Sequence, residues 1–210
     1  MLYKFRPIEQ LSSLADILIN KRLFCAPYYT LNDPFEGQFL QAIHFPPNTL
    51  FPKGLRTVAL TSLEDINGPE DYVIVRVCSL SSDMKDVRLW SHYAGGHRGV
   101  AIEIDVTDAM GDFDRVNYAP KLPLFDDPKY AGPSWKMALT TKTIHWEYEK
   151  EYRVITAEEF YPINGRIRRV IAGVRCRTTD IPVIQKMLPE NVALCRARLD
   201  EDRTEITIRE

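Results

Sequence analysis

The sequence predicts a single α+β domain with a curled, largely antiparallel sheet flanked by short helices. The chain has 210 residues, which is the length of one domain. Predicted strands follow one another without regular alternation with helices, which disfavours a doubly wound parallel sheet. No repeat, low-complexity tract or linker divides the chain, so we expect one domain over residues 1–210. Irregular excursions are expected where turn residues recur, at about 44–54 and 120–133.

In the first half of the chain, short strands surround two helices. Leu11, Leu14 and Leu18 fall at helical spacing. Asp86 precedes a second helical stretch, which a pair of glycines ends. The predicted elements are helices at 9–21 and 86–93, strands at 2–6, 23–26, 72–80 and 99–106, a loop at 28–37 and an ambiguous stretch at 57–68. In the predicted strand at 99–106, Glu103 is expected to face solvent, because it alternates with apolar residues.

The second half predicts more strands than helices. Asn164-Gly165 is a turn signal, and Asp180 is placed to cap a helix. The predicted elements are strands at 115–119, 146–155 and 167–172, a hairpin of 193–199 with 205–208, and helices at 135–139 and 180–187.

Composition and charge exclude several classes of protein. Hydrophobic residues make up 45% and charged residues 27%, as in ordinary globular domains. A net charge of −2 provides no general field for nucleic acid or an anionic membrane. The arginines between 166 and 198 offer one local basic patch. Since several alternate with Ile167 and Val170, a solvated strand face is favoured over a nucleic-acid groove.

Cysteine spacing and the N-terminal sequence indicate the cellular compartment that we expect for the protein. Cys25, Cys78, Cys176 and Cys195 lie far apart, so neither a zinc site nor a disulfide framework is predicted. The N-terminus lacks a signal-peptide layout, and no apolar run reaches the length of a membrane span. We therefore expect a cytoplasmic protein with no membrane partner and no metal.

The most polar segment is the predicted strand over residues 146–155. Because side chains alternate along a strand, Glu149, Glu151 and Arg153 are expected on one face. Carboxylates held this close shift each other's pKa and can act in catalysis. A solvent-facing strand with surface ion pairs explains the same pattern equally well.

Two further clusters carry polar side chains. Asn32, Asp33 and Glu36 lie in a loop with Pro34, which suits either a binding loop or a self-bonded turn. The stretch 91–99 contains His92, Tyr93 and His97 beside glycines. A pair of histidines at i and i+5 does not share a helical face, so a metal site is not predicted.

Together these clusters resemble a known bacterial family. The motifs are Leu2-Tyr3-Lys4-Phe5-Arg6, Asn32-Asp33-Pro34-Phe35-Glu36, Leu89-Trp90-Ser91-His92-Tyr93, His97-Arg98-Gly99 and Trp146-Glu147-Tyr148-Glu149-Lys150-Glu151-Tyr152-Arg153. In this order they resemble the domain-of-unknown-function 2971 family over nearly the whole chain. That family brings no established activity with it.

A more remote resemblance suggests a chemistry. The opening strand with Tyr3 and Arg6, followed by a helix and a short strand, is similar to the start of ADP-ribosyltransferase-like folds, particularly the DNA-modifying toxins. Those enzymes carry a basic or His residue on the first strand, a Ser or Thr at a strand end, and a late Glu. The matching residues here are Arg6, Ser79 or Ser81, and Glu151, with Glu147 and Glu149 competing for the last position.

This resemblance implies an enzyme that consumes NAD, such as a toxin or phage-defence effector. Glu151 would stabilise the oxocarbenium-like centre left by departing nicotinamide, and Glu149 would orient the acceptor. The residues expected to hold NAD are Tyr3, Arg6, Ser79, Ser81, His92, Tyr93, His97 and Arg153. Those expected near the acceptor, a nucleic acid or protein, are Asn32, Asp33, Glu36, Trp90 and Trp146.

Two other functions fit the sequence. A nucleic-acid enzyme or binder would use the histidines near the acidic segment and would bind with a steep salt dependence. A non-catalytic interaction domain would use the charged clusters as a structural ion-pair network.

Overall fold

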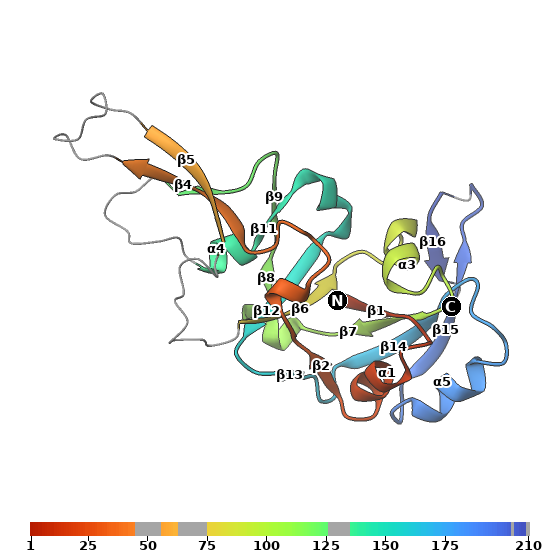
Figure 1. Cartoon of the computed structure of the whole chain (residues 1–210). Helices are drawn as coiled ribbons and strands as arrows, with labels where there is room; N and C mark the ends of the chain where they lie inside the picture. The colour runs from red at the N-terminus through yellow and green to blue at the C-terminus, as the bar shows by residue number, and fades with distance from the viewer. Residues whose placement is uncertain (45–55, 63–74, 126–134, 203, 209–210) are drawn as a thin grey trace.

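The protein is built on one large, open, mostly antiparallel sheet (Figure 1). The computed structural model describes residues 1–44, 56–62, 75–125, 135–202 and 204–208. The nine-stranded sheet has the order β16-β15-β14-β7-β1-β6-β12-β8, with β3 also paired to β6. Its strands are β1 (Leu2–Arg6), β3 (Ala26–Pro27), β6 (Arg76–Ser81), β7 (Val100–Ile104), β8 (Asp114–Arg115), β12 (Glu151–Thr156), β14 (Ile167–Ala172), β15 (Ala193–Leu199) and β16 (Ile206–Ile208).

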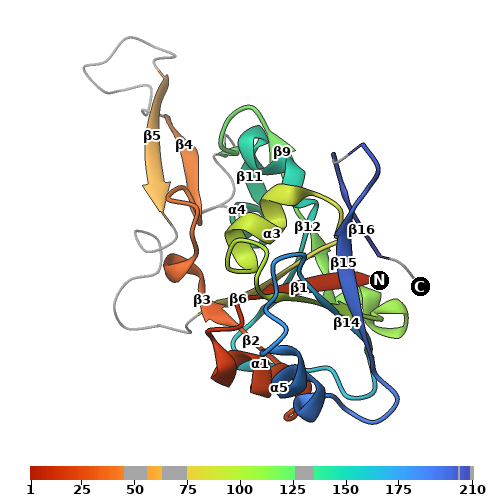
Figure 2. The ribbon, with the colours of Figure 1, turned by 90° about the vertical axis from the view of Figure 1, so that its right-hand side faces the viewer.

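The helices are short and cover both faces of this sheet. They are α1 (Leu11–Leu18), α3 (Val87–Tyr93), α4 (Trp135–Leu139) and α5 (Ile181–Met187), with 3-10 turns η1 (Tyr28–Thr30), η2 (Thr107–Asp112) and η3 (Ile144–Glu149). The two views show α1 and α5 on one face and α3 on the other (Figures 1 and 2). Leu14 and Ile184 accordingly pack in one core cluster, and Trp90 packs in a second.

The predicted α+β domain, with a largely antiparallel sheet and short helices, is confirmed. The prediction that the sheet is curled is wrong. Closing a sheet requires its two edge strands to meet. Here the edges β16 and β8 are three and two residues long and lie at opposite ends of the strand order, so the sheet stays open.

Small sheets flank the large one. Their strands are β2 (Arg22–Phe24) with β13 (Phe160–Pro162), β9 (Asn117–Ala119) with β11 (Thr141–Thr143), and β4 (Gln38–His44) with β5 (Arg56–Ser62) and β10 (Leu124–Phe125). The β4–β5 pair projects away from the body of the molecule (Figure 2). Of the two predicted excursions, residues 45–54 and 126–133 lie outside the described residues.

Most predicted elements are present. The strands at 2–6 and 167–172, the helix at 135–139 and the C-terminal hairpin are confirmed. The Asp86 cap is also confirmed, since its carboxylate accepts the Arg88 N–H at 2.8 Å. The helix expected at 9–21 covers only Leu11–Leu18. In the ambiguous stretch at 57–68, residues 57–62 belong to strand β5, and residues 63–68 lie outside the described residues.

Two side-chain expectations are wrong because an arginine supplies a partner. Glu103, expected to face solvent, is 7% exposed and accepts a bond from Arg169 at 2.8 Å. Asp180 does not cap α5 with its side chain, because both of its carboxylate oxygens accept from Arg177.

The large sheet is interrupted between β1 and β6. β1 pairs with β7 at five positions, whereas the β1–β6 register within these described strands contains only the pair Tyr3↔Ser81. Further along β6, the partner is β3, through Ala26↔Val77. Residues 78–80 of β6 therefore lie where the strand changes partner, and the two halves of the sheet separate there.

A close backbone approach holds the end of β1 in place. A Cβ added to Gly99 would lie 2.1 Å from the Arg6 carbonyl oxygen, although Gly99 has no left-handed backbone. Gly99→Ala must displace the end of β1, so we expect it to lower the free energy of unfolding by about 1–3 kcal/mol. Gly111→Ala, where no atom lies within 4 Å of the new Cβ, is the control and should change it by less than about 0.5 kcal/mol. Urea denaturation measures both, and equal midpoints for the two variants would contradict the close approach.

Among the described residues, no helix is long and apolar enough to cross a membrane.

Candidate functional site

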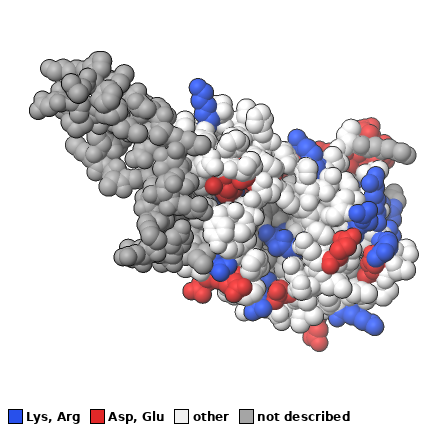
Figure 3. All heavy atoms as spheres, in the orientation of Figure 1, with Lys and Arg blue, Asp and Glu red and all other residues white. Residues whose placement is uncertain are grey.

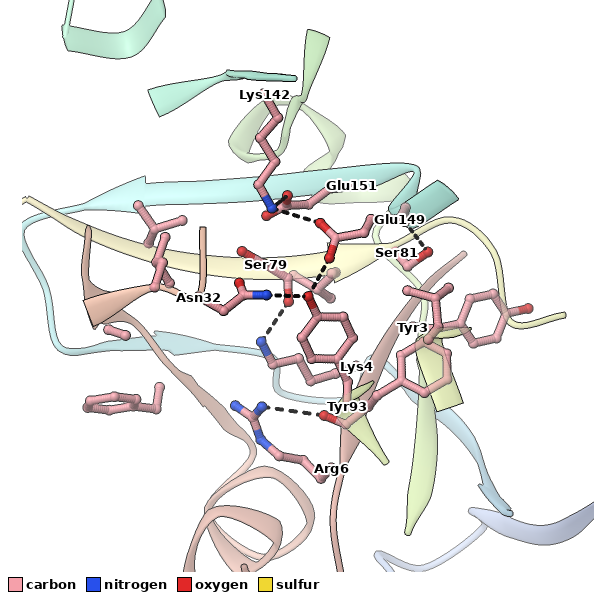
Figure 4. A pocket seen from close by; sticks show the side chains of 17 residues that line it. Tyr3, Lys4, Arg6, Asn32, Ser79, Ser81, Tyr93, Lys142, Glu149 and Glu151 are labelled. Atoms are coloured by element: carbon pink, nitrogen blue, oxygen red, sulfur yellow. Dashed lines mark hydrogen bonds and ion pairs between the residues drawn. The ribbon is translucent and has the colours of Figure 1, made fainter. Parts of the chain in front are cut away.

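A pocket of about 210 Å³ opens where β1 and β6 separate (Figure 4). β1 and β6 form its floor, and residues of the loop after β3, of α3, of β11 and of the η3–β12 turn complete its wall. The predicted site residues that line it are Tyr3, Arg6, Asn32, Ser79, Ser81, Tyr93, Glu149 and Glu151. Lys4 and Lys142 also line it and were not predicted.

The acidic pair reaches the pocket through a turn. The predicted strand over 146–155 is wrong in its first half, because η3 ends at Glu149 and β12 begins only at Glu151. Between them Lys150 adopts a left-handed conformation, with φ of 43°. Its side chain is anchored by an ion pair with Asp83 at 2.7 Å. The two carboxylates converge as predicted, but this turn brings them together and not the alternation of side chains along a strand.

The carboxylates are buried, so the solvent-facing interpretation is wrong. Glu149 is 4% exposed, Glu151 is 3% exposed and Arg153 is fully buried. Arg153 donates from Nε to Glu151 Oε1 at 2.7 Å and, with its two terminal nitrogens, to Glu36 at 2.5 and 2.8 Å. It also donates to the Leu139 carbonyl oxygen at 2.5 Å. Arg153 thereby joins the loop carrying Glu36 to β12.

Lys142 bridges the two pocket carboxylates. Its Nζ lies 2.7 Å from Glu149 Oε2 and 2.9 Å from Glu151 Oε2. The other oxygen of Glu149 accepts the Tyr93 hydroxyl, which in turn accepts from Asn32 Nδ2 at 2.8 Å. A continuous chain of hydrogen bonds thus runs from the mouth of the pocket to the buried arginine.

Burial and ion pairing push the carboxyl pKa values apart. Burial opposes ionisation of Glu151, but Arg153 and Lys142 outweigh it and lower its pKa to about 2. Burial raises the pKa of Glu149, which Lys142 only partly offsets. Burial likewise raises the pKa of Glu36. Carboxyl groups with separated pKa values in one pocket are the arrangement that acid–base chemistry uses.

The β1 side of the pocket is cationic. Lys4 is 8% exposed, and its Nζ donates to the Ser79 carbonyl oxygen across the separated strands at 2.6 Å. Arg6 Nε is buried without a hydrogen-bond partner. Among the described residues, no carboxylate forms an ion pair with either side chain. Burial lowers the pKa of both, and the neighbouring Cys78 only partly offsets this, since a desolvated cation is unfavourable. An anionic ligand group would supply the missing partner.

The two serines have different surroundings. Ser81 Oγ donates to the Glu149 carbonyl oxygen at 2.6 Å, and it accepts the Asp83 N–H at 3.0 Å. It therefore holds the turn before β12. Ser79 lies opposite Arg153 in the β6–β12 register, and its hydroxyl helps to keep the pKa of Glu151 low.

The remaining predicted residues do not line the pocket. Trp90 is fully buried in the core against Phe5, so its expected role at the acceptor is wrong. Asp33 accepts the Phe35 N–H at 2.9 Å, which is the self-bonded turn alternative. Glu36 and Arg153 lie behind the pocket in the ion-pair network. Two of the aromatic residues, His92 and Trp146, contact Tyr148.

His97 also stays outside the pocket. Its φ is 70°, and its carbonyl oxygen accepts the Arg175 N–H at 3.0 Å, so the residue forms a turn after α3. The expectation that His97 binds NAD beside Arg6 stays a prediction, since His97 does not line the pocket and its backbone position alone does not test it.

Lys4 and Lys142 gave weak signals in the sequence. Lys142 lies in Thr141-Lys142-Thr143, which is an ordinary exposed strand pattern, and only the tertiary structure brings it to the acids. Lys4 could have been found, because strand alternation places it on the same face as Leu2, which lies in the core.

The structure offers little support for a basic groove. Four arginines of the predicted patch pair with acids: Arg166 with Asp108, Arg168 with Asp105, Arg169 with Glu103 and Arg177 with Asp180. Acidic and basic side chains are interspersed on the visible face (Figure 3). Within the described part of the chain, no group of three or more His, Cys, Asp or Glu residues is placed to hold a metal ion.

Comparison of the chain with protein-family models, curated proteins and solved structures found no match.

Proposed function

We propose that the protein is an ADP-ribosyltransferase-like enzyme that consumes NAD. One observation carries this proposal: one pocket at a break in the sheet has Lys4 and Arg6, which form no ion pair with a carboxylate of the described residues, at one end and buried carboxylates at the other. NAD has the matching polarity, with a negatively charged diphosphate and a positively charged nicotinamide ring. The three positions that match the resemblance lie on neighbouring strands. Arg6 is on β1, Ser79 and Ser81 are on β6, and Glu151 begins β12.

The reaction assigns a task to each end of the pocket. Arg6 and Lys4 would bind phosphate oxygens. Glu151, ionised at neutral pH, would stabilise positive charge at the ribose carbon as its bond to nicotinamide breaks and nicotinamide leaves with the electron pair. The acceptor's O–H or N–H group would then bond to that carbon, and Glu149 would take its proton. The products are nicotinamide, the modified acceptor and one proton.

The size of the pocket limits what it encloses. A volume of about 210 Å³ is below the ~300–1,000 Å³ of pockets that bury drug-sized ligands. We therefore expect it to enclose the nicotinamide ribose and adjoining phosphate, with the adenosine outside.

The experiment is NAD binding by calorimetry together with nicotinamide release in the presence of cell lysate. Arg6→Met should weaken NAD binding about tenfold or more, because a charge-assisted bond to phosphate is lost. Arg168→Met removes an exposed arginine already paired with Asp105 and should bind NAD as wild type does. Absence of both NAD binding and nicotinamide release in the wild type would refute the proposal.

The second candidate is a non-catalytic interaction domain. The observation in its favour is the extent of the buried ion-pair network, which also connects the loop of Glu36 to the sheet. Under this alternative, a folded wild-type protein releases no nicotinamide with any lysate.

A further inference from the structure

The small β9–β11 sheet presents two side chains to the acidic turn. Its strands are parallel, and Lys142 of β11 is the register partner of Tyr118 of β9. The Tyr118 hydroxyl accepts the Glu151 N–H at 2.8 Å, while Lys142 Nζ contacts both carboxylates. Tyr118 thus fixes the backbone where β12 begins. Lys142 fixes the side chains of Glu149 and Glu151, as Figure 4 shows.

The two carboxylates receive unequal support. Glu151 is bound by Arg153 through both oxygens, at 2.7 and 3.2 Å, and by Lys142. For Glu149, Lys142 is the only cation in contact among the described residues, and its second oxygen receives a neutral hydroxyl. Removal of Lys142 would leave Glu151 with a cation and Glu149 with none.

We propose that Lys142 is a positioning residue that divides the roles of the pocket carboxylates. Lys142 supports the charge of Glu149, the carboxyl group that exchanges a proton at the pocket surface, while Arg153 keeps Glu151 a permanent anion even without Lys142. The assignment of an acceptor proton to Glu149 rests on the proposed function, whereas the division of charge between the two carboxylates does not.

The groups that face Glu149 support this division. They are Lys142 from β11, Glu151 from β12, Tyr93 from α3, Tyr148 of its own 3-10 turn and Tyr118 from β9. Lys142 alone among them adds positive charge, while Glu151 adds negative charge. Loss of the lysine therefore favours the protonated form of Glu149, and its pKa must rise.

The first test follows the glutamate side-chain carbons by NMR during a pH titration. The Glu149 signal is assigned with Glu149→Gln. In Lys142→Met we expect Glu149 to titrate at a pH higher by about one unit or more, with Glu151 still ionised. Lys142→Arg keeps the charge and should titrate as wild type does. Lys136→Met removes an exposed lysine paired with Asp114 and is the matched control. An unchanged Glu149 titration in Lys142→Met, or protonation of Glu151 before Glu149, overturns the proposal.

A second measurement covers the case in which Lys142→Met folds poorly. The carboxylate left unpaired should be Glu149, so adding Glu149→Gln to Lys142→Met should restore the melting temperature. Adding Glu151→Gln should not. Restoration by Glu151→Gln instead would overturn the assignment.

Activity separates this inference from the proposed function. If the wild type releases nicotinamide with lysate, the acid limb of its pH profile should shift upward in Lys142→Met by the same amount as the Glu149 titration. If the wild type releases none, the proposed function fails, and the NMR titration still decides the role of Lys142.

Discussion

Arg153→Met is expected to lower the free energy of unfolding by about 3–5 kcal/mol, the largest stability effect that the structure predicts. Arg153 is fully buried, and it is bound by Glu36 and Glu151 and by the Leu139 carbonyl oxygen. A methionine fills similar volume but leaves two buried carboxylates without this cation. Removing one member of a buried ionic network costs far more than breaking a surface pair, because the remaining charge stays desolvated.

Arg168→Met is the matched control. Arg168 forms a comparably short contact with Asp105, 2.6 Å, but its side chain is 55% exposed. We expect a loss of at most about 1 kcal/mol. Urea denaturation of both variants with unchanged m-values provides the comparison. Similar midpoints for the two would show that the buried network does not contribute as its geometry implies.

The pH dependence of stability provides a second observable for Arg153. The folded-state pKa of Glu151, about 2, lies below its ordinary value of 4.5. Its stabilising contribution is therefore complete above about 4.5 and lost as the pH falls toward 2. Arg153→Met raises this pKa, so that less stability from Glu151 remains to be lost on acidification. The raised pKa values of Glu149 and Glu36 act in the opposite sense, since those groups favour folding more as the pH falls.

The sequence predicted the strands that carry the site better than it predicted their surroundings. The alternation in Leu2–Arg6 and the apolar run into Ser81 are local patterns, and both strands are present. β1 and β6 pair at a single residue pair because β3 pairs with the next part of β6. No local sequence pattern indicates this change of partner.

For the acidic segment, the predicted convergence of two glutamates is correct, but the predicted reason for it is wrong. Strand periodicity placed Glu149 and Glu151 on one face, and they do converge. Their convergence instead needs a left-handed Lys150, a conformation that costs energy for a residue other than glycine. Its contact with Asp83, a residue distant in sequence, supports that conformation and is invisible to a local pattern.

Glu151→Gln is expected to reduce nicotinamide release by about 10²–10³-fold, with or without lysate, if the protein consumes NAD as proposed. The amide preserves size but removes the negative charge that would face the developing oxocarbenium centre. Glu158→Gln, at an exposed turn, is the control and should retain wild-type rates. Circular dichroism checks that each variant is folded.

Glu149→Gln should separate the two steps of the reaction. Because Glu149 would take the proton of the acceptor, its loss should abolish the stimulation by lysate while basal release changes only a few-fold. The distinction follows from the contacts: Glu151 is held by two cations and remains charged, whereas Glu149 has one cation and a neutral tyrosine and can gain or lose a proton. Equal losses of basal and lysate-stimulated release in both variants would mean that the carboxylates act as one unit, and the assignment of separate roles would then be wrong. A charge that two cations hold fixed suits stabilisation of a cationic centre, and a carboxyl group free to titrate suits proton transfer.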